Sequence, residues 1–153
     1  MGKFADAFRS GLDAKEQREN AETEVRHVLA EAAADLGGLF GEGFSLTLRR
    51  QTKLVEGIQT EIKKAMGIVP KKYEVEVWVV RGEHGTDTSP SLAEIEFAEA
   101  GYPVEVRWPD RLTYGEDIEG FRRAVVELLA SRQAATHLST LLPEPDNEDE
   151  GPA

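Results

Sequence analysis

Cysteine is absent from the 153-residue chain. Without thiols there is no disulfide framework, no zinc site with thiolate ligands and no iron–sulfur cluster. This composition is compatible with a cytoplasmic protein, which is the location we expect. Long apolar runs are lacking too, since none approaches the roughly 18 to 20 residues of a membrane-spanning helix. The first residues have no apolar signal-peptide core, and Asp6 breaks the myristoylation pattern, so we expect no membrane partner.

Motifs for catalysis and metal binding are scarce. The three histidines, His27, His84 and His137, lie far apart, and none has the His-Glu-x-x-His spacing of a zinc site. Four glycines fall between residues 37 and 43, but a phosphate-binding loop would follow a strand and include a lysine. Because these glycines follow a predicted helix and include no lysine, they predict a helix end and a flexible joint. We therefore expect no cofactor.

One polar loop keeps an enzymatic alternative open. Residues 81–91 follow a predicted strand, and Glu83, His84 and Asp87 lie within five positions of one another. Convergence of these groups would suit a small metal-dependent enzyme. No nucleophile motif accompanies them, and a solvated loop explains the same composition, so we predict a non-enzymatic protein.

Charge is unevenly distributed in this chain of 18 basic and 29 acidic residues, whose net charge is −11. The last eleven residues, 143–153, contain five acidic residues, three prolines and no large apolar side chain, which predicts a disordered acidic tail. Residues 49–72, by contrast, hold seven basic and two acidic residues, so phosphate contacts are an alternative function. No aromatic residue interleaves there and the whole chain is acidic, so we do not expect nucleic acid as the partner.

Apolar periodicity predicts a helical arm over residues 1–36. The first apolar stripe repeats every four residues, at Phe4, Phe8 and Leu12. A second apolar stripe lies between residues 21 and 36. Narrow stripes are typical of a helix that lies along a domain edge or pairs with another helix.

Residues 44–142, after the Gly-rich joint at 37–43, predict an α+β domain. Alternation predicts strands at 44–48, 73–80, 92–98 and 104–108, the last two forming a hairpin, although capping signals keep a helix open for 92–98. Helical spacing predicts helices over 52–66, 116–130 and 134–142, with a capping box from Thr113 to Glu116 and with Leu138 and Leu142 inward. The expected fold is a small, mainly antiparallel sheet covered by helices, with an N-terminal helical arm and a disordered acidic tail.

Alternation also divides the predicted strands between two faces of the sheet. The covered face would hold Val75, Val77, Val79, Ala93, Ile95, Phe97, Val104, Val106 and Trp108. The opposite face would hold the candidate partner-binding residues Glu74, Glu76, Trp78, Glu94, Glu96 and Glu105. Three explanations stay open for this acidic face: it is solvated, the basic 49–72 segment neutralises it, or it docks a cationic partner. Trp78 would anchor such a partner, unless the N-terminal helix covers it.

We interpret the chain as a non-enzymatic binding or assembly protein. Its partner would be another protein or a second copy of the chain. The candidate contact residues of the arm are Phe4, Phe8 and Leu12. A basic partner would meet the acidic sheet face or the tail.

Overall fold

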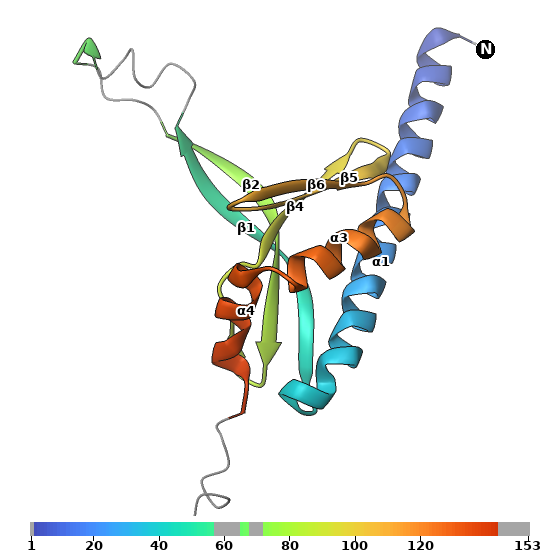
Figure 1. Ribbon diagram of the computed structural model, residues 1–153. Coiled ribbons are helices and arrows are strands. Elements are labelled where there is room, and N and C mark those ends of the chain that lie inside the picture. The colour runs from blue at the N-terminus through green and yellow to red at the C-terminus, as the bar shows by residue number, and fades with distance from the viewer. Residues whose placement is uncertain (1, 57–64, 68–71, 144–153) are drawn as a thin grey trace, which may run out of the picture.

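The computed structural model describes residues 2–56, 65–67 and 72–143. Helix α1 (Lys3–Phe40) comes first and is followed by strands β1 (Phe44–Glu56), β2 (Lys72–His84), β3 (Asp87–Thr88), β4 (Ala93–Ala98), β5 (Gly101–Trp108) and β6 (Arg111–Gly115). Helices α3 (Ile118–Leu129) and α4 (Arg132–Leu138) and the 3-10 turn η1 (Ser139–Leu141) complete the described chain. The fold is α+β, as expected (Figure 1).

The strands form one antiparallel sheet in the order β1-β2-β4-β5-β6, with β3 paired to β2. The predicted hairpin is confirmed, because Ile95 lies opposite Val106 and Phe97 lies opposite Val104. Its alternating side chains bury one face while Glu96 stays exposed, and this pattern settles the strand assignment of 92–98 over the helical alternative.

Strands β1 and β2 extend well beyond the rest of the sheet. They pair along their whole length, whereas β2 pairs with β4 only through Trp78, Val79 and Val80. The remainder forms a two-stranded ribbon that leaves the body (Figure 1). The helix predicted over 52–66 is therefore wrong for residues 52–56, and residues 57–64 lie outside the described chain. Pairing with β2 satisfies this backbone, and it outweighs a helical apolar spacing that is only a local preference.

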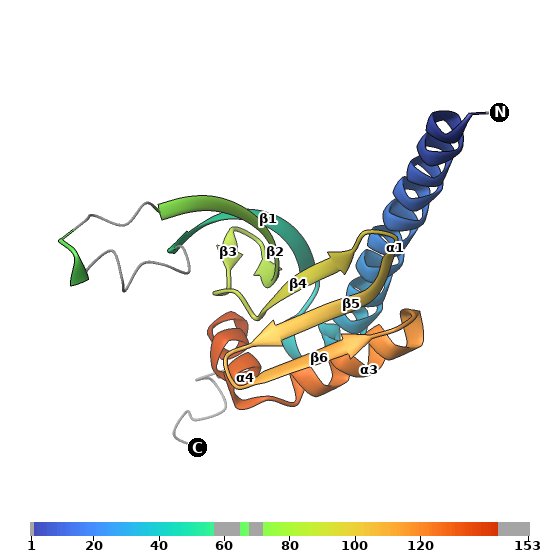
Figure 2. The same ribbon diagram turned by 90° about the horizontal axis from the view of Figure 1, so that it is seen from above.

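The hydrophobic core lies between one face of the sheet and helices α1 and α3. Val25 and Leu29 of α1 and Phe121 of α3 are fully buried against strand residues such as Val104 and Val106. Figure 2 shows β4, β5 and β6 passing over these two helices. The sequence prediction that the helix near 116–130 covers the sheet is confirmed.

Three element ends differ from the sequence predictions. Helix α1 runs through Gly37 and Gly38 as far as Phe40, four residues beyond the predicted end, because the buried Phe40 ring stacks on Phe44 with centroids 4.2 Å apart. Residues 111–115 form β6 rather than a helix start, since Thr113 pairs with Val106 of β5. The N-cap of α3 is instead Asp117.

The C-terminal helix is shorter than predicted. Ser131 caps α4, which ends at Leu138 and passes into the turn η1. Leu138 is buried as expected, but Leu141 replaces Leu142 as the second inward side chain because the 3-10 turn advances by three residues rather than 3.6 per turn. The predicted tail lies outside the described chain from residue 144 onward.

Candidate functional site: the projecting arm and the groove at its base

Helix α1 has a buried half and an exposed half. Its buried side chains begin at Ala21 and continue through Val25, Val28 and Leu29 toward Phe40. Residues 3–16 are the exposed part of the helical arm predicted over 1–36, and they project past the end of the sheet (Figure 1). From here on, "the arm" means residues 3–16 only. At about 1.5 Å per residue the arm is about 20 Å long. The sheet reaches α1 at Gly101, whose Cα packs beside Ala21 and the carbonyl of Gln17.

The three predicted contact residues of the arm are all solvent-exposed. Phe4 is 93% exposed, Phe8 68% and Leu12 49%. On a helix that turns about 100° per residue, Phe4 and Leu12 lie within about 40° of Phe8, so the three form one continuous stripe. The charged side chains between residues 3 and 13 lie at least about 100° away from Phe8, on the other side of the arm; they are Lys3, Asp6, Arg9 and Asp13.

The exposed stripe and the buried side of α1 diverge where the sheet first covers the helix. There Ala21 and Val25 lie about 140° and 100° around the helix axis from Phe8, whereas Ala33 and Phe40 further along return to within about 40° of it. At the base of the arm the body therefore covers a different side of α1 from the one that carries Phe8. A contact on this stripe would come from the flank of the arm, where the chain's own sheet does not reach.

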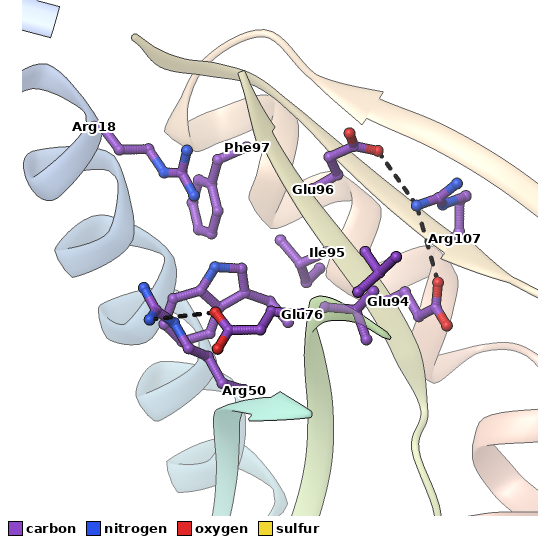
Figure 3. A pocket seen from close by; sticks show the side chains of 11 residues that line it. Arg18, Arg50, Glu76, Glu94, Ile95, Glu96, Phe97 and Arg107 are labelled. Atoms are coloured by element: carbon purple, nitrogen blue, oxygen red, sulfur yellow. Dashed lines mark hydrogen bonds and ion pairs between the residues drawn. The ribbon is translucent and has the colours of Figure 1, made fainter. Parts of the chain in front are cut away.

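A mixed groove opens at the base of the arm, where β2 separates from β4. It encloses about 310 Å³ and is lined by α1, β1, β2, β4 and β5. Figure 3 shows Arg18 of α1 and Arg50 of β1 at one side and Glu94, Glu96 and Arg107 at the other. The guanidinium of Arg18 lies 4.7 Å from the centre of the Phe97 ring. The same arginine pairs with Glu22 one turn further along α1.

Trp78 is half-buried and lies between two arginines at this groove. The guanidinium of Arg50 is 4.7 Å and that of Arg26 is 5.5 Å from the indole, while Phe97 meets the indole edge-on at 6.4 Å. Such cation–π contacts contribute on the order of 0.5 to 1 kcal/mol at exposed sites. Of the two placements predicted for Trp78, the structure shows it beside the N-terminal helix rather than on the acidic face.

The predicted register between β2 and β4 is wrong by one residue. Trp78 lies opposite Ile95, so Trp78 and Val80 share the helix-covered face, and Val79 shares the other face with Glu94. Alternation alone could not place these strands, because four consecutive residues of β2, 77–80, are apolar and either register buries an apolar side chain. The predicted covered-face residues Val75, Val77 and Val79 consequently belong to the opposite face.

The six predicted acidic-face residues are divided by this register. Glu74 and Glu76 alternate with Trp78 on β2, whereas Glu94, Glu96 and Glu105 share the face opposite the helices. Cations of the same chain form ion pairs with most of these glutamates. The N–O distances are Lys53–Glu94 2.8 Å, Arg107–Glu96 3.3 Å, Arg50–Glu76 3.6 Å, Arg107–Glu94 3.9 Å and Arg107–Glu105 3.9 Å. Two of these cations, Arg50 and Lys53, come from the basic segment and the third, Arg107, from β5, so ion pairs within the chain offset part of this acidic charge.

The polar loop predicted at 81–91 is mostly sheet. Glu83 and His84 end β2, and Asp87 pairs with His84 as part of β3. Hydrogen bonds from Thr47 and Arg49 hold the pKa of the Glu83 carboxyl below its usual range. The His84 ring lies 2.9 Å from the carbonyl of Glu42, so both side chains already have partners. Within the described ranges, no three His, Asp or Glu side chains are placed to hold one metal ion.

Sequence reasoning missed the arginines that hold the base of the arm. Arg18 precedes Ala21 by three residues and Val25 by seven, so it lies on the side of α1 that packs on the body. A charged residue in a buried stripe was the available signal. Arg26 and Arg50 left no such signal, because their shared contact with Trp78 joins three segments that are distant in sequence.

Helices in the described part of the chain all lack the combined length and apolarity needed to cross a membrane. Comparisons of the chain with protein-family models, with curated proteins and with solved structures found no match. A proposal about the function is therefore based on the fold and the surface of the molecule.

Proposed function

We propose that the protein is a non-enzymatic assembly protein whose binding element is the arm. One observation carries this proposal: Phe4, Phe8 and Leu12 form an exposed apolar stripe on a helix that projects from the body. Single exposed apolar residues are ordinary on protein surfaces, but a continuous stripe of large side chains on one element is typical of an interaction site.

The energetics of the helix point the same way. Most helices in proteins are stabilised by packing of an apolar face. The arm continues a helix whose later part is packed on the sheet, but its own apolar face is exposed, and it contains Gly11 and Ser10, which are poorer helix formers than alanine. Packing a partner over Phe4, Phe8 and Leu12 would supply the missing stabilisation and remove these side chains from water.

The two alternative functions have less support. In the nucleic-acid alternative, Arg49, Arg50 and Lys53 would bind phosphates, but they pair with Glu83, Glu76 and Glu94. A phosphate would have to displace these carboxylates. In the enzymatic alternative, a metal would have to displace the partners of Glu83 and His84.

A substitution experiment tests the proposal in the full chain. Phe4, Phe8 and Leu12 are changed together to serine, and the matched control changes Lys3, Asp6 and Asp13, on the other side of the arm, to serine. Removal of residues 1–36 is unsuitable, because Ala21, Val25, Val28, Leu29 and Ala33 belong to the core. The native mass of each variant is measured by light scattering after purification, and cross-linked adducts are measured in a lysate of the host.

We expect the wild-type chain and the control to form assemblies or adducts that the stripe variant does not form, while all three unfold at the same urea concentration when they are dilute enough to be monomeric. Monomeric wild type without any adduct would overturn the proposal. So would equal loss of association in the stripe variant and the control.

A further inference from the structure

We infer that the arm pairs with the arm of a second copy of this chain, antiparallel and two-fold symmetric about Phe8. This inference rests on the proposed function and names its partner. The observations that carry it are the spacing of the apolar stripe, the charge of the arm relative to the body, and the direction that the stripe faces.

The apolar stripe has the same four-residue spacing on both sides of Phe8. Phe4 and Leu12 each lie four residues from Phe8. When two arms run antiparallel with Phe8 at the level of Phe8 in the other copy, each Phe4 lies beside a Leu12. Ala5 and Gly11, each three residues from Phe8, then lie at one level, and their small size allows the two helices to approach closely. A self-complementary patch of this kind is what a two-fold interface requires.

Net charge separates the arm from the rest of the molecule. Residues 1–20 contain four basic and four acidic residues, so the other residues carry the whole net charge of −11. Two copies repel each other through their bodies and not through their arms. Antiparallel pairing places the two acidic bodies at opposite ends of the helix pair, whereas parallel pairing would place them side by side. Electrostatics therefore favours the antiparallel arrangement.

The charged side chains between residues 3 and 13 also lie outside the apolar stripe. Lys3, Asp6 and Asp13 lie on its far side, so pairing through the stripe buries none of these charges. The first charged residue on the stripe side is Lys15, whose ammonium pairs with Glu19 at 3.0 Å. In an antiparallel pair centred on Phe8, Lys3, the first residue of α1, lies at the level of Asp13 of the other copy. The overlap of the two helices thus stops before Gln17, where α1 meets the turn into β5.

The stripe lies to one side of the surface by which the base of the arm meets the body. Because Phe8 is turned about 100° from Val25, and because the sheet covers α1 only from Ala21 onward, the second arm approaches from the flank and does not compete with the sheet for α1. Burial of two phenylalanines and a leucine from each copy forms a small interface, below the roughly 800 Å² per partner of a standard one. We therefore expect a weak and reversible dimer.

The native mass of the full chain, measured by sedimentation between about 1 and 300 μM, tests the pairing. We expect the mass to rise from 16.9 kDa toward twice that value. Phe8→Asp places two carboxylates at the two-fold axis, and we expect its Kd to rise at least about tenfold. Ser10→Asp adds the same charge on the far side of the arm and should dimerise like the wild type.

Single cysteines test the direction of pairing, because the chain has no cysteine of its own. In the antiparallel pair, Phe8→Cys brings the two thiols together at the axis and should form a disulfide-linked dimer. Phe4→Cys alone should not, because its two thiols are about 12 Å apart along the pair, beyond disulfide reach. Mixing Phe4→Cys with Leu12→Cys should restore cross-linking between the two.

Each outcome separates this inference from the proposed function. Equal self-cross-linking of Phe4→Cys, Phe8→Cys and Leu12→Cys would show parallel pairing and would overturn the arrangement. A wild type that stays monomeric to 300 μM would overturn self-pairing; the proposed function would then stand only if the stripe variant still lost adducts with another protein. Loss of both would overturn the two together.

Discussion

Arg26 connects helix α1 to the first strand: its Nη1 donates a hydrogen bond of 3.0 Å to the carbonyl of Leu48. The same guanidinium lies over Trp78 of the neighbouring strand. One side chain thus contacts both strands where they begin to leave the sheet, just beyond the residues at which α1 becomes buried. Arg26 therefore positions the base of the arm relative to the sheet.

Replacing Arg26 with alanine removes both contacts. We expect the free energy of unfolding to fall by about 1 to 2 kcal/mol, because a charged donor to a carbonyl and a cation–π contact are lost together. Urea unfolding followed by tryptophan fluorescence measures the change. Lys15→Ala, which removes a cation from exposed α1, should change stability by less than about 0.5 kcal/mol. Equal effects of the two variants would contradict the positioning role of Arg26.

Gly101 occupies a site where the arm meets the sheet. A Cβ there would lie 2.6 Å from the Cβ of Ala21 and 3.1 Å from the carbonyl of Gln17, and the residue has a φ of +99°. We expect Gly101→Ala to destabilise the protein by about 3 kcal/mol through steric overlap and backbone strain. Gly43→Ala is the control, since its φ is +88° with nothing within 4 Å of a Cβ.

Comparison of the two glycine variants separates the steric contact with α1 from the cost of backbone strain. Gly43→Ala should cost only the backbone strain, about 1 to 2 kcal/mol. Thermal unfolding measured by circular dichroism gives both values. If Gly101→Ala were no more destabilising than Gly43→Ala, the close approach of the sheet to α1 would be refuted.

Asp117 caps helix α3, and its carboxylate accepts a 2.7 Å hydrogen bond from the amide of Gly120. Asp117→Ala should lower the free energy of unfolding by about 1 kcal/mol, because a helix N-terminus then lacks an acceptor for one of its free amides. Glu116→Ala, at the residue that the capping-box prediction used, should change it by less than about 0.5 kcal/mol. A larger loss in Glu116→Ala would favour the capping box over the observed helix start.

Protonation of the Glu83 carboxylate makes the stability of the protein depend on pH in the acid range. Because hydrogen bonds from Thr47 and Arg49 lower its pKa in the folded state, the carboxylate binds protons more weakly folded than unfolded. Its stabilisation is therefore complete above the unfolded-state pKa and is lost as the pH falls through the lowered folded-state value. We expect Glu83→Gln to weaken the decline in stability below about pH 5. An unchanged pH profile in that variant would contradict this origin.

Strong local patterns predicted much of the fold. The hairpin from residue 93 to residue 108 followed from the strict alternation of apolar residues with glutamates, which only a half-buried strand accommodates. Helix α3 followed from apolar residues at helical spacing, although its first residue did not. Residues 113–116 resembled a capping box, yet Thr113 joined the sheet because β5 offered it a backbone partner.

Contacts between distant segments decided the rest. Residues 52–56 have an apolar spacing that fits a helix, but their pairing with β2 makes them strand. The face of Trp78 depended on the register of β2 against β4, which the four consecutive apolar residues 77–80 left open. The acidic sheet face was consequently predicted as one surface, and the structure divides its glutamates between two.

The arm shows both the properties that local sequence determines and those that the tertiary structure determines. From the sequence alone follow the absence of cysteine, the helical spacing of Phe4, Phe8 and Leu12 and the neutral charge of residues 1–20. These are local properties, and each depends only on the residues concerned. Only the tertiary structure decided that the body covers α1 from Ala21 onward, so that the first stripe stays exposed while the second enters the core. Which of two similar stripes is buried depends on where the sheet lies, and the sheet is built by residues far away in the chain.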